Sequence, residues 1–312
     1  MKKKIIAVVG PTASGKSALA IELAKRVNGE IICCDSMQIY KLMNIGTAKP
    51  DATEINAVPH HLFDFADPCE SFSCADYIPL AKKCVEDVLS RGKMPIFCGG
   101  TGLYLERFLS GADFESTDID EDFRQEMLDF ATNNGNEALH ERLREIDPIS
   151  ADEIHPNNVK RVIRALEIYK TSGKRKSDID RDSKLFESEY DAIRIGVRFD
   201  DRELLYGRIA LRVDKMMEEG LLEETKALLE NGIFEKNSTA AQAIGYKELL
   251  SYFDGAKTLD EAIDDLKTAT RRYAKRQMTW FNSHGDVHWL VADGRDTPSL
   301  ADEAEEHIRN KM

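Results

Sequence analysis

Residues 5–17 read Ile5-Ile6-Ala7-Val8-Val9-Gly10-Pro11-Thr12-Ala13-Ser14-Gly15-Lys16-Ser17, and this stretch decides the fold. Its first five residues are apolar and mostly β-branched, which is typical of a buried parallel strand. The next eight match G-x-x-x-x-G-K-S, and the apolar stripe over residues 18–27 predicts a helix. Strand, glycine loop and helix in this order are the context that a phosphate-binding P-loop requires. Glycine turns also join ordinary strands to helices, but the Lys16-Ser17 pair favours the phosphate site.

The polar groups of this loop suit a phosphate ligand. Backbone N–H groups of a glycine loop and of a helix N-terminus bind phosphate oxygens. Lys16 is expected to reach the terminal phosphates, and the Ser17 hydroxyl is expected to bind Mg²⁺. The loop alone leaves open whether the ligand is a diphosphate or a polyphosphate. The residues expected to bind this ligand are Gly10, Thr12, Ala13, Ser14, Gly15, Lys16 and Ser17.

The composition is that of a globular chain of roughly two domains. The chain has 312 residues, of which 42% are hydrophobic and 32% charged, and its net charge is −13. No apolar run approaches the roughly 20 residues that span a bilayer, so we expect no membrane segment. The loop strand follows Met1 so closely that we also expect no signal peptide. Six cysteines without a C-x-x-C pair favour free thiols in a reducing cytoplasm over disulfides or zinc.

Two further short strands are expected to end beside the loop. Residues 30–34 lead into Asp35, and residues 95–98 lead into Gly99-Gly100-Thr101. Because ligands of open α/β sheets lie beyond the carboxyl ends of the strands, Asp35 and Thr101 are expected in the crevice of Lys16. An Asp also commonly caps a helix or turn, so position alone leaves both roles of Asp35 open. The strand at 95–98 carries no Walker-B Asp, which argues against ordinary ATP hydrolysis.

Residues 112–190 lose the strand pattern and predict an all-helical insertion. The predicted fold is therefore α/β, a P-loop NTPase-like parallel sheet flanked by helices, formed by residues 1–111 and 191–312. The helix after Pro156 combines an apolar stripe with a basic face. A solvated charged face is the ordinary explanation, but the one nearby acid, Glu167, leaves most of this face positive and favours contact with a phosphate backbone. The stripe is Val159, Val162, Ile163, Leu166 and Tyr169, and the basic face is Lys160, Arg161 and Arg164.

The second part of the core predicts more strands and helices. Residues 191–197 and 287–291 are expected strands, and Asp200 or Asp201 is expected to cap a long helix. On this helix Arg208 and Arg212 lie one turn apart, either at the surface or within reach of a diphosphate. Residues 301–312 are expected to form a short polar tail. The His60-His61 pair favours structural roles over a metal site, because adjacent side chains point apart.

Further motifs give the chain a family resemblance. It resembles the bacterial tRNA dimethylallyltransferases, also called isopentenyltransferases. The matching stretches run in family order from the loop to about residue 290. They are residues 10–17, Asp35-Ser36-Met37-Gln38-Ile39-Tyr40, Ile45-Gly46-Thr47-Ala48-Lys49-Pro50, Val58-Pro59-His60-His61, Gly99-Gly100-Thr101-Gly102-Leu103-Tyr104, His155-Pro156-Asn157-Asn158, Ala243-Ile244-Gly245-Tyr246-Lys247-Glu248 and the segment 271–281.

The resemblance implies transfer of a dimethylallyl group from dimethylallyl diphosphate to an adenosine of tRNA. In the family this adenosine is position 37, next to the anticodon on its 3′ side, in tRNAs that read codons starting with U, and the product is N6-isopentenyladenosine. The P-loop would then hold the donor's diphosphate with Mg²⁺. A cytoplasmic monomer without a membrane partner is expected.

The resemblance also implies roles for individual residues. Asp35 is the expected general base, and Thr101, with Arg208 or Arg212, is expected to stabilise the diphosphate leaving group. Gln38 has the amide that pairs with adenine's edge. In the family the position of Lys160 in the tRNA-contacting helix is often Gln. Lys160 keeps the phosphate role and leaves a base-specific contact at this position open. The expected tRNA-binding residues are Asp35, Ser36, Met37, Gln38, Thr101, Arg124, Lys160, Arg161, Val162, Ile163 and Arg164.

Two other functions share the P-loop. One is a small-molecule kinase that uses ATP, and the other is a regulatory module that binds a nucleotide as a switch. Both account for Lys16 and Ser17, but both leave the segment 35–38 and the basic helix of the insertion unexplained. A preference for ATP over dimethylallyl diphosphate would favour them.

Overall fold

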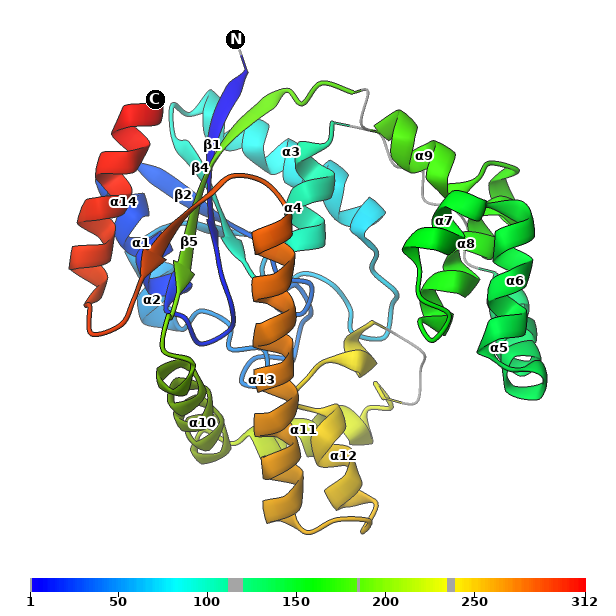
Figure 1. The fold of residues 1–312 in the computed structure, drawn as a ribbon. Coiled ribbons are helices and arrows are strands. Elements are labelled where there is room, and N and C mark those ends of the chain that lie inside the picture. Colours follow the sequence, from blue (N-terminus) through cyan, green and yellow to red (C-terminus); the bar gives the residue numbers. More distant parts are fainter. Residues whose placement is uncertain (1, 112–119, 184–185, 235–238) are drawn as a thin grey trace. The chain divides into compact units, whose positions relative to one another are not determined.

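The computed structural model in Figure 1 describes residues 2–111, 120–183, 186–234 and 239–312. The chain forms two compact units. The core unit consists of Met1–Leu109 and Glu189–Met312, and the insertion unit is Ser110–Ser188. The predicted boundary at residue 112 lies outside the described residues. Tyr190, which the prediction placed in the insertion, begins a strand of the core unit.

In the described part of the core unit, six parallel strands form one sheet in the order β3-β2-β4-β1-β5-β6. The strands predicted from the sequence are confirmed, and β3 is an additional strand at His60-His61, where none was predicted. Strand β1, near the centre of the sheet, pairs with β5 from Lys3 opposite Tyr190 to Val9 opposite Gly196. The strands are β1 (Lys3–Val9), β2 (Gly29–Cys33), β3 (His60–His61), β4 (Met94–Gly99), β5 (Tyr190–Arg198) and β6 (Val287–Val291).

Helices cover both faces of this sheet (Figure 1). Alternate residues of β1 point to opposite faces. Ile6 and Val8 pack with residues of α1 and α14, and Ile5 and Ala7 pack with residues of α3, α4 and α13. These helices are α1 (Lys16–Arg26), α14 (Thr297–Lys311), α3 (Cys74–Ser90), α4 (Gly102–Leu109) and α13 (Leu259–Ser283).

The predicted polar tail at residues 301–312 is wrong, because residues 301–311 belong to α14. The Asp296 side chain caps this helix by accepting a hydrogen bond from the Ser299 amide. Leu300, Ala304 and Ile308 recur every fourth residue and are buried in the cluster that holds α1. The segment contains few apolar residues, and its composition therefore suggested a polar tail. The spacing of these residues nevertheless places all of them on one helix face.

A second group of core helices supports the chain segment that follows β2. Ile39, Tyr40 and Met43 from this segment are buried against residues of the helices after β5. The Asp201 side chain caps the first of these helices, as one of the two predicted alternatives. The helices are α10 (Arg202–Glu218), α11 (Leu221–Glu230), η1 (Ala240–Gln242) and α12 (Lys247–Phe253), and α2 (Ala52–Ala57) lies earlier in the chain.

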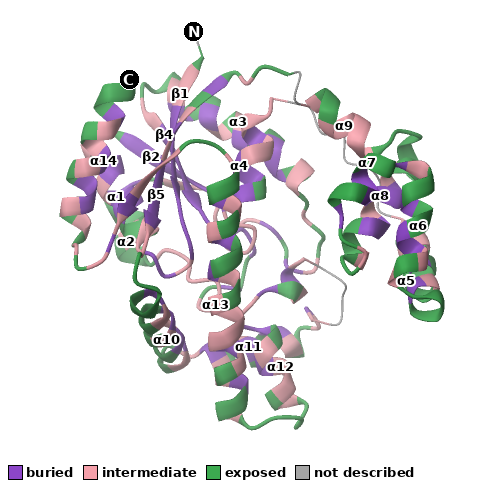
Figure 2. Cartoon of the chain, in the orientation of Figure 1, coloured by how far each residue is buried: buried purple, intermediate pink, exposed green. Residues whose placement is uncertain are grey.

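The described part of the insertion unit is helical, as the sequence predicts. Its core includes Leu139, Leu143, Val162 and Leu166, and Figure 2 shows that much of α8 is buried among its neighbours. Tyr169 departs from the predicted apolar stripe, since 40% of it is exposed. The helices are α5 (Glu121–Asn134), α6 (Asn136–Ile146), α7 (Pro148–Glu153), α8 (Val159–Ser172) and α9 (Lys176–Ser183). Among the described residues of the whole chain, no helix is both long and apolar enough to cross a membrane.

Candidate active site

The glycine loop between β1 and α1 has the backbone geometry that its sequence requires. Gly10 has a φ of 146°, and a Cβ there would lie 2.6 Å from the carbonyl oxygen of Val197. Gly15 adopts the left-handed conformation at the N-cap of α1 and supplies no side-chain cap. The first amide groups of a helix have no acceptor within the helix. The loop therefore presents backbone N–H groups and the positive end of the helix dipole to a ligand.

The side chains of the loop add to this cradle. The Ser14 hydroxyl is buried and has no hydrogen-bond partner among the described residues. Lys16 donates from Nζ to the Pro11 carbonyl oxygen at 3.2 Å. Burial lowers the pKa of Lys16, and the nearby Cys98 and Asp35 act in the opposite direction. Ser17 is exposed at the start of α1. A buried hydroxyl without a partner and a partly desolvated ammonium both gain from an added anion.

Arg208 and Arg212 both contact this loop from α10, and Arg208 is exposed whereas Arg212 is half-buried. The Arg208 Nε donates to the Ala13 carbonyl oxygen at 2.8 Å, and the Arg212 Nη1 donates to the Thr12 hydroxyl at 3.3 Å. Burial lowers the pKa of Arg212, and Asp35 partly offsets this effect. Two guanidinium groups therefore lie against the residues that precede Lys16.

Asp35 and Thr101 lie at the ends of adjacent strands, as predicted. The Thr101 amide donates to the Cys34 carbonyl oxygen at 3.1 Å, and the Thr101 hydroxyl accepts from the Ser36 amide at 3.0 Å. Asp35 Oδ1 accepts from the Met37 amide at 2.9 Å. Asp35 therefore caps a turn through one oxygen, and its other oxygen has no hydrogen-bond partner among the described residues. The two roles left open by the sequence are compatible.

Two residues of α13 near this site were missed by the sequence reasoning. Gln277 donates from Nε2 to the Gly100 carbonyl oxygen at 3.0 Å and accepts from the Thr12 amide at 2.8 Å. A Cβ at Gly100 would lie 2.0 Å from Gln277 Nε2, which explains this glycine. Burial, and then the charge of Asp35, raise the pKa of Tyr273. A polar residue at a buried helix position was the available signal for Gln277.

Gln38 is half-buried, and its amide is already engaged. Its Nε2 donates to the carbonyl oxygens of Thr47 at 3.0 Å and Ala48 at 2.8 Å. The predicted use of both the donor and the acceptor of this side chain toward a base is therefore not available in this conformation. The acceptor oxygen has one contact, from Cys33 Sγ at 4.0 Å.

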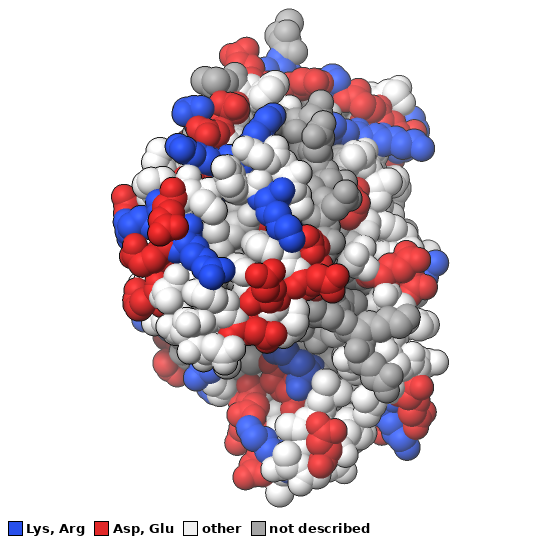
Figure 3. Space-filling model, turned by 90° about the vertical axis from the view of Figure 1, so that its right-hand side faces the viewer, with Lys and Arg blue, Asp and Glu red and all other residues white. Residues whose placement is uncertain are grey.

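In the insertion unit, the predicted tRNA residues separate into three groups. Lys160 and Arg161 are exposed on α8 and have no acidic partner among the described residues. Arg124 and Arg164 both pair with Glu167, which is fully buried. Val162 and Ile163 are buried in the insertion core, so their side chains do not form an outer face. On the face of the molecule that Figure 3 shows, acidic side chains lie among the basic ones.

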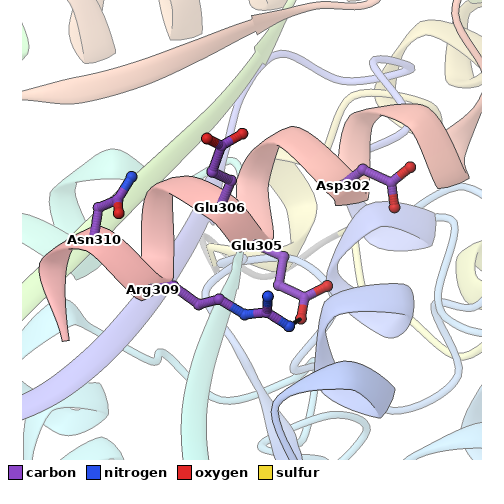
Figure 4. Close-up of a pocket in the computed structure, with 5 residues that line it drawn as sticks. All are labelled: Asp302, Glu305, Glu306, Arg309 and Asn310. Carbon is purple, nitrogen blue, oxygen red and sulfur yellow. Dashed lines mark hydrogen bonds and ion pairs between the residues drawn. The ribbon is translucent and has the colours of Figure 1, made fainter.

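Other charged clusters hold the fold together. His61 contacts Glu30 at 2.7 Å and His60 contacts the Val58 carbonyl oxygen at 2.8 Å, so both histidines have structural partners. In the described residues, no group of three or more His, Cys, Asp or Glu side chains could hold a metal ion. Figure 4 shows a surface hollow along α14. Its lining consists of Asp302, Glu305, Glu306, Arg309 and Asn310, and Arg26 of α1 pairs with two of these acids.

The geometry first defines a class of protein. A parallel sheet whose central strand leads through G-x-x-x-x-G-K-S into a helix is the P-loop NTPase-like fold.

Comparison with known proteins then defines the family. A family model described as IPP transferase matches residues 38–284, and one described as isopentenyl transferase matches residues 3–64. The tRNA dimethylallyltransferase of Acetivibrio thermocellus is 49% identical over 293 residues, which cover 94% of this chain and 93% of the relative. That of Halalkalibacterium halodurans is 46% identical over 312 residues, with coverage of 100% and 98%. The chain belongs to the IPP transferase family of prenyltransferases.

Solved structures agree with this assignment. The tRNA isopentenylpyrophosphate transferase of Bacillus halodurans matches with a TM-score of 0.71 at 45% identity, over 99% of both chains. A eukaryotic dimethylallyltransferase acting on tRNA matches with a TM-score of 0.74 at 33% identity. That match covers 93% of this chain and 74% of the eukaryotic chain. The resemblance seen in the sequence is confirmed.

Proposed function

We propose that this chain transfers a dimethylallyl group from dimethylallyl diphosphate to N6 of adenosine 37 of tRNA. The acceptors are tRNAs that read codons starting with U, and the product is N6-isopentenyladenosine. The family supports the reaction class, because its curated relatives are tRNA dimethylallyltransferases. The cation cradle at the glycine loop, beside a carboxylate at the end of the neighbouring strand, is the observation that carries the proposal.

The cradle suits a diphosphate that leaves. Lys16, Arg208 and Arg212 meet at one short loop whose amide groups and Ser14 hydroxyl add hydrogen-bond donors. During transfer the bond between the allylic carbon and the diphosphate oxygen breaks, and the bridging oxygen gains negative charge. Fixed donors and cations at this position stabilise the transition state more than the ground state.

Asp35 is proposed as the general base. The lone pair of adenine N6 is delocalised into the ring, which makes this nitrogen a poor nucleophile. As the new C–N bond forms, N6 must lose a proton, and Asp35 takes it through the oxygen that does not cap the turn. Such proton transfer contributes roughly 10²- to 10⁴-fold. Thr101, held against the Ser36 amide, lines the same strand end and is proposed to contact the reacting groups.

The residues present fit Mg²⁺ bound mainly through the diphosphate. Mg²⁺ usually takes one or two protein ligands and completes its shell with phosphate oxygens and water. Ser17 offers an exposed hydroxyl at the start of α1, which fits a single protein ligand. When bound, the ion would supply charge neutralisation to the leaving group.

The tRNA is proposed to contact both units. Lys160 and Arg161 suit the phosphate backbone, and Gln38, with the rest of segment 35–38, suits the flipped target base. Arg124 and Arg164 contribute less charge to this contact, because Glu167 binds both. A monomer acting in the cytoplasm completes the proposal.

The proposal is tested by a transfer assay. Purified protein, tRNA that lacks the modification, Mg²⁺ and tritiated dimethylallyl diphosphate should yield labelled tRNA. After nuclease digestion of this tRNA, the label should be recovered in N6-isopentenyladenosine. Tight binding of ATP without transfer of label would contradict the proposal and favour a kinase or a nucleotide switch.

A further inference from the structure

One carboxylate organises the turn formed by residues 44–48. Glu224, on α11, accepts hydrogen bonds from the amides of Asn44, Ile45 and Gly46 at 3.0 to 3.1 Å. It also accepts from the Tyr246 hydroxyl at 2.7 Å. Three consecutive amides on one carboxylate fix the direction of the turn, because each bond restricts a different peptide plane.

Tyr246 closes this arrangement from a second side. A Cβ at Gly46 would lie 2.5 Å from the Tyr246 ring, so the turn and the ring are in close contact. Tyr246 is buried in the cluster that contains Met43 and Leu221. The turn is therefore held by a charged acceptor on one helix and by an aromatic ring at the start of the next.

The carbonyl oxygens of the same turn orient Gln38. Thr47 and Ala48 each accept a hydrogen bond from Gln38 Nε2. A backbone carbonyl only accepts, so the amide nitrogen of Gln38 must face the turn. Its oxygen accepts from Cys33 Sγ at 4.0 Å and, with two lone pairs, keeps acceptor capacity for a second donor. As long as the turn holds its direction, Gln38 presents an acceptor and no donor to a base.

We infer that Glu224 is a positioning residue that selects adenine by holding Gln38 in this orientation. The inference rests on the proposed function and names a determinant of its specificity. An acceptor matches the 6-amino group of adenine, whereas unsubstituted purine has only a C–H and no N–H donor at position 6. Glu224 touches no base, and it acts through the turn.

The test compares two anticodon stem-loops in full-length protein with Mg²⁺ and inorganic diphosphate. One carries adenosine at position 37 and the other carries purine riboside. Wild-type protein should bind the adenosine stem-loop more tightly, because Gln38 and Asp35 both accept from its 6-amino group. Glu224→Gln replaces an acceptor oxygen with a donor that opposes the turn amides, and the preference should fall about tenfold, the value of the one good hydrogen bond to Gln38, to the part that Asp35 supplies.

A double-mutant cycle separates positioning from general damage. Gln38→Leu should by itself lower the preference to the part that Asp35 supplies, and Glu224→Gln should then have no further effect on the ratio. Glu223→Gln, an exposed neighbour on α11, should keep the wild-type ratio. Affinity for inorganic diphosphate should be the same in all variants, because the cradle is not altered.

Each outcome decides a different point. If Glu224→Gln keeps the adenosine preference, or changes it equally with and without Gln38, the inference is wrong. If wild-type protein transfers no label from dimethylallyl diphosphate to tRNA, the proposed function fails first. An unchanged melting temperature of Glu224→Gln together with a lowered preference would leave positioning as the explanation.

Discussion

At the scale of single residues, Asp35 combines two demands on one carboxylate. One oxygen caps the turn at Met37, and the other is left for chemistry. Asp35→Asn keeps an acceptor for the Met37 amide but removes the base. We expect kcat to fall about 10²- to 10⁴-fold while the KM for dimethylallyl diphosphate stays within about threefold. Single-turnover transfer assays measure this effect, and unchanged turnover would remove Asp35 as the base.

Gln277 joins two parts of the site that lie far apart in sequence. Gln277→Leu would leave the Thr12 amide and the Gly100 carbonyl without their partner in a buried place. We expect a loss of about 1–3 kcal/mol in the free energy of unfolding and a higher KM for the donor. Denaturant titration and kinetics measure the two effects.

Thr279→Ala on the exposed side of the same helix serves as the matched control. This variant should leave both the stability and the KM for the donor unchanged. If Gln277→Leu shifted stability alone, the link between the glycine loop and the strand end would have no role in donor binding.

At the scale of elements, α5 and α8 are joined by a buried ion network. Glu167 is 0% exposed and binds Arg124 and Arg164. Burial alone would raise the pKa of Glu167, but the two arginines outweigh it and the pKa is lowered. The arginine side chains are 30% and 40% exposed, so the cost of losing Glu167 is that of a hydrogen bond to a charged group, about 1.5–3 kcal/mol. Glu167→Gln should therefore destabilise the insertion unit at pH 7, as measured by hydrogen exchange of the α8 amides in the full chain.

The same network predicts a pH dependence. A carboxyl whose pKa is lowered on folding contributes stability above its unfolded value of 4.5, and this stability is lost as pH falls through the folded pKa. The protection of α8 in wild-type protein should fall below about pH 4.5. The difference between wild type and Glu167→Gln should shrink over the same range. If the difference in α8 protection between wild type and Glu167→Gln were the same at pH 7 and pH 3, the lowered pKa assigned to Glu167 would be wrong.

The exposed basic positions of α8 predict a separate effect on tRNA. Lys160→Ala combined with Arg161→Ala should raise the KM for tRNA about tenfold or more and should reduce the salt dependence of binding. The KM for dimethylallyl diphosphate should stay unchanged. Filter binding at several salt concentrations measures the slope, with Lys83→Ala on α3 as a control from the core unit. An unchanged slope would exclude α8 from the phosphate contact.

At the scale of the whole molecule, the sequence predicts the features that depend on neighbouring residues. The β-branched run of β1, the glycine loop and the cap at Asp201 are local signals, and each is confirmed. Asp35 and Thr101 were predictable because parallel strands end at the same edge of the sheet.

The features that the sequence did not predict depend on distant partners. Gln277 binds Thr12 and Gly100, and although a polar residue at a buried helix position marks Gln277, the local pattern of α13 identifies neither partner. Arg124 of α5 pairs with Glu167 of α8, and the sequence pattern of α8 does not reveal this contact between two helices. The positive charge expected to be available for tRNA was therefore overestimated. The α14 helix was missed because its surface is strongly charged and only a narrow apolar stripe meets α1.

The pairing of β1 with β5 has a consequence for synthesis of the chain on the ribosome. β1 and β4 leave the exit tunnel early and pair with each other, but the other side of β1 pairs only with Tyr190–Arg198. Until that segment emerges, the nascent sheet presents an open apolar edge while the whole insertion is being made. Such an edge is a binding site for chaperones and a starting point for aggregation. Ribosome-bound chains that end before Tyr190 should therefore be sensitive to protease. Chains long enough for Tyr190–Arg198 to have left the exit tunnel should be protected.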